Sequence, residues 1–184
     1  MRDEVKVNFQ YISRPMNTKL LFEVSTDRGD NLLVKFTEDY SEDAHRYCSN
    51  NGIAPVLHAV EELSGGWKMV VMDLLDDPYD IVKLPLPEGL FESLQRAVGT
   101  LHKGGFVHGD IRSCNFLFYK DQEEFKVMIL DFDWAGVIGA AKYPDNINTV
   151  SVERPDGVGP GLPIIAKHDL EMIDLIVKPK KTHW

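Results

Sequence analysis

Two short segments in the second half of the chain concentrate side chains that could do chemistry. The first, HGDIRSCN, carries Asp110, Arg112 and Asn115, and the second, ILDFD, carries Asp131 and Asp133. Carboxylate and amide oxygens are hard ligands that suit Mg²⁺. A loop carboxylate such as Asp110 could accept the proton of a reacting hydroxyl group. These residue types predict a magnesium-dependent reaction at a hydroxyl group.

The segment between them predicts a hairpin that would bring Asn115 and Asp131 together. Two short apolar runs, Phe116–Phe118 and Val127–Leu130, surround the polar stretch 120–124, which is typical of two antiparallel strands and their turn. Taken singly, each acidic or amide residue could equally be a turn or capping residue. The occurrence of both segments in one order and spacing favours the chemical interpretation.

The first part of the chain is strand-rich. Leu20–Ser25 and Asn31–Phe36 flank the turn-forming stretch 26–30, and Val56–Glu62 and Trp67–Met72 flank Ser-Gly-Gly, so we expect two hairpins. A short helix should lie between them, with Ser41 as N-cap and Gly52 just past its end. Lys35 ends an apolar strand, where it could point into a cleft or simply be a solvated edge charge.

A proline-containing loop, Asp76–Pro87, divides the chain. After it, Leu90, Leu94, Val98 and Leu101 recur at helical spacing; residues 137–166 should be mostly irregular, and a last helix should precede the basic KPKK tail. We therefore predict an α+β fold with a β-rich lobe over 1–75, including the short helix, and a reduced, mostly helical lobe over 76–184.

These segments carry a resemblance to kinases. HGDIRSCN resembles the catalytic loop H-x-D-x-x-x-x-N, ILDFD resembles the metal-binding D-F-G segment, and LVKF resembles the strand that carries the kinase lysine. The order of elements also matches over about residues 18 to 177. The sequence is most similar to fungal protein-kinase-like sequences and to aminoglycoside/choline-kinase-like phosphotransferases. The resemblance implies binding of ATP and Mg²⁺.

The resemblance also implies roles for single residues. Asp110 is the expected catalytic carboxylate, Arg112 stands where kinases commonly have a phosphate-neutralising lysine, and Asn115, Asp131 and Asp133 are the expected metal ligands. For ATP we expect Lys35, its partner carboxylate Glu42, and the connector residues Asp73 and Leu75, whose backbone could pair with adenine. Asp169 should accept N–H bonds from the catalytic loop, and His108 should be a buried structural residue.

Three departures from the kinase pattern stand out. The turn before the lysine strand, 14–19, contains no glycine, although Arg14 or Lys19 could supply charge. The partner of Lys35 is less clear than in kinases, because Glu42 also suits a helix start. The chain ends soon after Asp169, so the second lobe is short.

Two functions of different classes follow. The first is an ATP-dependent phosphotransferase acting on a protein Ser/Thr or on a small hydroxyl compound. The alternative is a pseudokinase that binds a nucleotide or a partner without turnover, which the missing glycines and the short lobe favour. A metal-dependent hydrolase using Asp131, Asp133 and His168 is a third, weaker interpretation.

Composition limits the partners. Twenty basic and 29 acidic residues give a net charge of −9, which argues against nonspecific nucleic-acid binding. No apolar run reaches the length of a membrane span, and the first ten residues lack a signal-peptide core. With only two cysteines, we expect an intracellular, cytoplasmic setting.

Because Gly109 replaces the arginine that often precedes the catalytic aspartate, we also expect activity without phosphorylation of Thr149 or Ser151.

Overall fold

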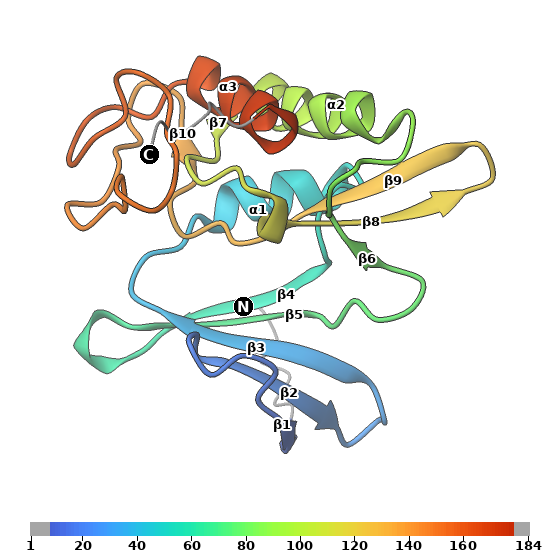
Figure 1. Cartoon of the computed structure of the whole chain (residues 1–184). Coiled ribbons are helices and arrows are strands. Elements are labelled where there is room, and N and C mark those ends of the chain that lie inside the picture. Colours follow the sequence, from blue (N-terminus) through green and yellow to red (C-terminus); the bar gives the residue numbers. More distant parts are fainter. Residues whose placement is uncertain (1–7, 179–184) are drawn as a thin grey trace. The chain divides into compact units, whose positions relative to one another are not determined.

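The computed structural model describes residues 8–178, which form two compact units (Figure 1). The first unit consists of the chain up to Asp39 together with Pro55–Leu75, and the second consists of Tyr40–Ala54 and the chain from Asp76 onward. The segment in which we found no signal-peptide core lies largely outside the described residues, and so does most of the KPKK tail.

The first unit is a five-stranded antiparallel sheet in the order β1-β2-β3-β5-β4. Its strands are β1 (Phe9–Ser13), β2 (Leu21–Thr26), β3 (Asn31–Thr37), β4 (Leu57–Glu62) and β5 (Lys68–Asp73), with a 3₁₀ turn, η1 (Ser64–Gly66), before the last. Both predicted hairpins, β2–β3 and β4–β5, are present. Strand β1 was not predicted, because its side chains are mostly exposed and leave no clear buried alternation.

One face of this sheet forms its own small core. Val24, Leu32, Val34 and Val71 are buried there. They come from three neighbouring strands and lie at alternating positions, since successive strand residues point to opposite faces. The alternation in the sequence therefore fixes which strand residues share this face.

Among the described residues, the second unit contains three α-helices and three antiparallel strand pairings, of which β8–β9 is a hairpin. Its elements are α1 (Glu42–Asn50), β6 (Asp80–Ile81), α2 (Leu90–Lys103), β7 (Phe106–Val107), η2 (Ser113–Asn115), β8 (Phe116–Asp121), β9 (Glu124–Ile129), β10 (Gly136–Val137) and α3 (Ala166–Val177). Helices α2 and α3 pack against each other (Figure 1). The predicted hairpin is β8–β9, and it is longer than expected, with only Gln122 and Glu123 outside its strands.

The apolar face of α2 builds the main core. Leu90, Leu94, Val98 and Leu101, the residues whose spacing predicted this helix, are fully buried. They share the core with residues of the β8–β9 hairpin and of α3, including Phe116 and Ile173. This packing anchors the hairpin, and with it the loop that precedes β8, on the helical part of the unit.

The short helix α1 belongs to the second unit, not to the strand-rich lobe in which the sequence analysis placed it. Its residues Ala44 and Cys48 are fully buried in the core of the second unit, and the Ser41 N–H donates to the Phe132 carbonyl at 3.1 Å. A helical apolar stripe shows that a face is buried but not against which partner. The predicted boundary at 75/76 coincides with a boundary between the units. Among residues 8–178, no helix is both long and apolar enough to span a bilayer.

Candidate functional site

The HGDIRSCN loop is held by a buried carboxylate of α3. Asp169 is 1% exposed and accepts the N–H groups of His108 and Gly109, each at 2.8 Å. The His102 imidazole lies 3.0 Å from the same carboxylate. Hydrogen bonds from backbone N–H groups to an ionised carboxylate are stronger than neutral ones. The structural role expected for Asp169 is confirmed.

His108 is a structural residue, as predicted. It is fully buried, its Nδ1 accepts the Asp110 N–H at 3.2 Å, and its Nε2 lies 2.9 Å from the Leu130 carbonyl. Nδ1 accepts a hydrogen bond and Nε2 faces an acceptor, so the tautomer with its proton on Nε2 can form both hydrogen bonds. His108 thus links the loop to the residue just before Asp131.

Gly109 is required by its conformation and by its surroundings. Its φ is +81°, in the left-handed region, and a Cβ built there would lie 2.6 Å from Cδ1 of Ile164. Glycine enters this region without steric cost. An arginine therefore cannot occupy this position without displacing Ile164, which explains why the chain lacks the arginine common before the catalytic aspartate.

Asp110 lies next to Gly109 and is held from three sides. Its Oδ2 receives Arg112 Nη2 at 2.5 Å and Asn115 Nδ2 at 3.1 Å, and its Oδ1 receives Arg154 Nη2 at 2.9 Å. The Asp110 side chain is 8% exposed. An ionised carboxylate has about four lone-pair positions, so one remains for an incoming hydroxyl group.

Asn115 and Asp131 are brought together by the β8–β9 hairpin, as the sequence predicted. The Leu130 N–H donates to the Asn115 carbonyl at 2.9 Å, which sets Asp131 next to Asn115 at the open end of the hairpin. The Asn115 amide nitrogen also donates to the Asp110 carbonyl at 2.8 Å. With its nitrogen used in this way, the Asn115 Oδ1 has, among residues 8–178, the Cys114 thiol at 3.6 Å as its one donor, and could serve as a cation ligand.

The ILDFD segment is fixed by aromatic packing around Phe132. His45 of α1 stacks on the Phe132 ring, with centroids 4.6 Å apart and planes 6° from parallel, and His108 contacts the same ring edge-on. Asp131 itself has a positive φ of +69°, an uncommon conformation for a residue with a side chain. The buried phenylalanine thus holds the two flanking aspartates at the surface of the packed core.

The acidic groups of the ILDFD segment and Asp110 act electrostatically on two neighbouring side chains. The pKa of Tyr40 is raised well above its usual value, first by burial and then by the negative charges of Asp133 and Asp131. Burial disfavours the charged form of Arg112, but its hydrogen bond to Asp110 and the charges of Asp110 and Asp131 outweigh this and raise its pKa. Asp131 is therefore within electrostatic range of both Tyr40 and the arginine at Asp110.

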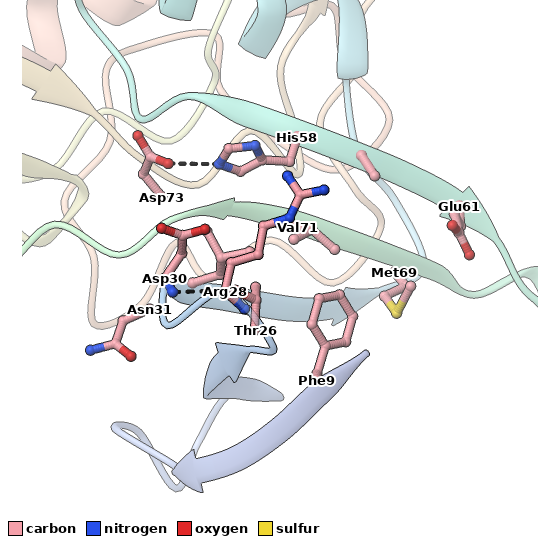
Figure 2. Close-up of a pocket in the computed structure, with 12 residues that line it drawn as sticks. Phe9, Thr26, Arg28, Asp30, Asn31, His58, Glu61, Met69, Val71 and Asp73 are labelled. Atoms are coloured by element: carbon pink, nitrogen blue, oxygen red, sulfur yellow. Dashed lines mark hydrogen bonds and ion pairs between the residues drawn. The ribbon is translucent and has the colours of Figure 1, made fainter. Parts of the chain in front are cut away.

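In the first unit, Lys35 and Asp73 lie on opposite faces of the sheet. Asp73 pairs with Leu32 across β3–β5, whereas Lys35 pairs with Val70, and residues three apart on a strand point to opposite faces. Asp73 and Val71 line a cavity of about 920 Å³ on the face away from Lys35 (Figure 2). Lys35 itself is buried.

One backbone group of Asp73, a residue expected to contact adenine, is used within the sheet. Asp73 is the last residue of β5. Its N–H donates to the Val56 carbonyl at 3.0 Å, and its carboxylate lies 2.7 Å from His58 Nε2 inside the cavity (Figure 2). The Asp73 N–H is therefore used within the sheet, and the adenine contact through the other backbone groups of the connector stays a prediction. Leu75 follows in the connector and is half-buried.

Two other charged residues of the sequence analysis have local partners. Glu42 forms an exposed ion pair with Arg46 one turn along α1, at 2.7 Å. Arg14 donates to the carbonyls of Asn17 and Lys19 and lies over the Phe22 ring. Arg14 thus shapes the turn between β1 and β2, which is the turn that lacks glycine.

The hydrolase interpretation finds no support. Over the described part of the chain, no three His, Cys, Asp or Glu side chains gather as a metal site. His168 bonds instead to the Tyr143 hydroxyl at 3.1 Å. A magnesium site of the kinase type does not need such a cluster, because Mg²⁺ uses one or two protein carboxylates with water and phosphate oxygens.

Sequence reasoning missed Arg154 and His45. Arg154 lies in the irregular stretch before α3, 44 positions after Asp110, and no spacing or motif in the sequence links the two. His45 lies on the buried face of α1, where the helical pattern marks it as buried but does not identify Phe132 as its partner.

Comparisons with known proteins agree with this geometry. The lipopolysaccharide kinase (Kdo/WaaP) family matches residues 77–146, which include the HGDIRSCN and ILDFD segments. The calcium/calmodulin-dependent protein kinase type 1 of Caenorhabditis elegans is 42% identical over 43 residues, covering 23% of this chain and 12% of that kinase. The match therefore spans a small part of this relative.

A solved structure shows the same fold. The kinase PK-1 of the Cydia pomonella granulovirus superimposes with a TM-score of 0.57 at 17% identity, over 71% of this chain and 53% of that one. The comparisons do not separate the fungal subgroup from the aminoglycoside/choline-kinase subgroup. Taken with the α+β fold and the order of the two segments, these matches support a protein-kinase-like superfamily for this chain.

Proposed function

We propose that the chain is an ATP-dependent phosphotransferase that acts on a hydroxyl group of a protein Ser/Thr or of a small molecule. The observation that carries the proposal is the joint placement of Asp110, Asn115 and Asp131. Asn115 bonds to both the carbonyl and the carboxylate of Asp110, and its own carbonyl receives the N–H that precedes Asp131. Phosphoryl transfer requires mainly this kind of positioning.

In the proposed reaction, Asp110 orients the acceptor hydroxyl. The acceptor oxygen forms a bond to the γ-phosphorus of ATP, the bond from that phosphorus to the bridging oxygen of ADP breaks, and the hydroxyl proton passes to the Asp110 carboxylate. Arg112, which touches Asp110, neutralises charge on the transferred group. Lys35, Asp73 and Leu75 remain the proposed ATP contacts of the first unit, and Glu42 is the proposed partner of Lys35.

Asn115 and Asp131, with Asp133, would hold Mg²⁺. The donor set fits, because the described residues offer the Asn115 Oδ1 no donor stronger than the Cys114 thiol, and Asp131 follows the residue that bonds to Asn115. A bound Mg²⁺ would supply positive charge that neutralises the phosphate oxygens.

The test is binding and turnover by the full chain. Mg·ATP should raise the melting temperature, since a ligand that binds only the folded state stabilises it, and ATP should be consumed when an acceptor is present. Asp131→Ala should remove the Mg²⁺-dependent part of the shift, whereas Asp174→Ala, on the exposed face of α3, should leave it unchanged. Absence of any shift with folded protein would overturn the proposal.

A pseudokinase is the second candidate, and two observations favour it. Arg14 is used by its own turn instead of reaching outward, and Asp110 is already bound by two arginines. In that case the Mg·ATP shift would appear without consumption of ATP. Turnover that disappears with Asp110→Asn would exclude it.

A further inference from the structure

Two arginines share one carboxylate at the centre of the site. Arg112 and Arg154 contact different oxygens of Asp110, at 2.5 Å and 2.9 Å. Two positive charges thus face one negative charge at direct contact, with the carboxylate of Asp131 as a second, more distant negative charge acting on Arg112. The two guanidinium groups are not fully neutralised by direct partners.

Each guanidinium group also carries a buried donor without a partner. Within the described residues, the buried side-chain nitrogens that lack a hydrogen bond are Arg112 Nε and Arg154 Nη1. The other nitrogens of Arg154 are used: Nη2 by Asp110, and Nε by the Asn148 carbonyl at 3.4 Å. A buried charged donor that lacks an acceptor is unfavourable, so its presence in pairs needs an explanation.

Arg154 is held rigidly enough to present that donor. Its side chain is 5% exposed, and its guanidinium carbon lies 5.3 Å above the Trp134 ring. Stacking on an aromatic face and a planar fork of donors fix the direction of the remaining N–H groups. Arg112 is 33% exposed, so its side of the pair borders solvent.

We propose that Arg112 and Arg154 form an oxyanion-binding site beside Asp110, with Arg112 Nε and Arg154 Nη1 as its donors. The ligand class is a phosphate-type oxyanion, since forked guanidinium donors match phosphate and carboxylate oxygens. Two sources share this chemistry: the γ-phosphoryl group of ATP, or an acidic group on the acceptor. The role in catalysis rests on the proposed function, but the binding of the oxyanion does not.

The first experiment titrates inorganic phosphate into the full chain and measures binding by calorimetry, at an ionic strength held constant with KCl. We expect saturable binding by the wild-type chain. Arg154→Lys keeps the charge at Asp110 but removes the forked donor, and should weaken binding at least tenfold. Arg96→Lys is the matched control, because Arg96 is exposed on α2 and its guanidinium group donates to the Ser93 hydroxyl, away from Asp110; it should bind phosphate like the wild type.

A second variant keeps the proposal testable if Arg154→Lys does not fold. Arg112→Lys, at the more exposed arginine, also removes one proposed donor and should weaken phosphate binding by a similar factor. Absence of saturable binding by the folded wild-type chain, or equal affinities of Arg154→Lys and Arg96→Lys, would overturn the proposal.

Two further measurements identify the source of the oxyanion and test the proposed function separately from the site. If saturating Mg·ATP abolishes phosphate binding, the site holds the γ-phosphoryl group; if phosphate still binds, the site holds an acidic group of the acceptor. Phosphate binding without ATP consumption would leave the site standing and remove the phosphotransferase. If the chain consumes ATP but does not bind phosphate, and Arg154→Lys consumes ATP at the wild-type rate, the phosphotransferase stands and the oxyanion site is ruled out.

Discussion

Arg154 Nη2 lies 2.9 Å from Asp110 Oδ1, although the two residues are 44 positions apart in the chain. Both side chains are more than nine-tenths buried. The contact joins the irregular segment before α3 to the loop that carries the proposed catalytic carboxylate. Leaving a buried charge without its partner costs about 3–5 kcal/mol, so this contact couples the conformation of that segment to the state of Asp110.

Asp110→Asn should separate binding from turnover. The change keeps the size of the side chain but removes the group that accepts the hydroxyl proton, and loss of such a group lowers rates by about 10²–10⁴-fold. Mg·ATP should still raise the melting temperature by the wild-type amount. The measurement is a turnover assay beside a thermal-shift titration, and equal loss of both signals would contradict the role given to Asp110.

Asp169→Ala should destabilise the second unit. It would leave the N–H groups of His108 and Gly109 buried without an acceptor, at about 1–3 kcal/mol for each unsatisfied group. The free energy of unfolding, measured with urea, should therefore fall by about 3 kcal/mol. Asp174→Ala on the same helix is exposed and serves as control; an equal effect of the two changes would refute the capping role.

Gly109→Ala should lower the free energy of unfolding for two separable reasons. The new Cβ would need a positive φ and would lie 2.6 Å from Ile164 Cδ1, and strain of this kind costs about 1–3 kcal/mol. Gly139→Ala is a matched control, because Gly139 has φ +86° but nothing within 4 Å of its Cβ position.

The difference between the two alanine variants then isolates the clash with Ile164. Adding Ile164→Val, which removes the contacted Cδ1 atom, should cost less in the Gly109→Ala background than in the wild type. A double-mutant cycle of unfolding free energies measures this. Strict additivity would show that Ile164 is not the obstacle.

Phosphorylation of Thr149 or Ser151 should not switch on activity. Gly109 offers no charge for such a phosphate. The segment is also held by Asn148, which bonds to the N–H and the hydroxyl of Ser151. Phosphatase-treated, phosphorylated and Thr149→Ala/Ser151→Ala protein should agree in one turnover assay. An increase of tenfold or more, about 1.4 kcal/mol of barrier, would contradict this.

The sequence by itself determined the local elements and the core of the site. The helical spacing of Leu90 to Leu101 defined α2, because a repeat of three and four residues places apolar side chains on one face. Two apolar runs around a polar turn defined the β8–β9 hairpin, and a hairpin necessarily brings its ends together. Asn115 and Asp131 could therefore be paired from their positions alone.

Only the tertiary structure decided which partners these elements meet. The apolar stripe on α1 predicted that one face of this helix is buried, but only the packing of Ala44 and Cys48 showed that it is buried in the core of the second unit. The register of β5 against β3 turned Asp73 to the face away from Lys35, because a strand reverses its side chains at every residue. Arg154 met Asp110 through a long irregular segment, whose path has no period from which a contact between distant residues could be predicted.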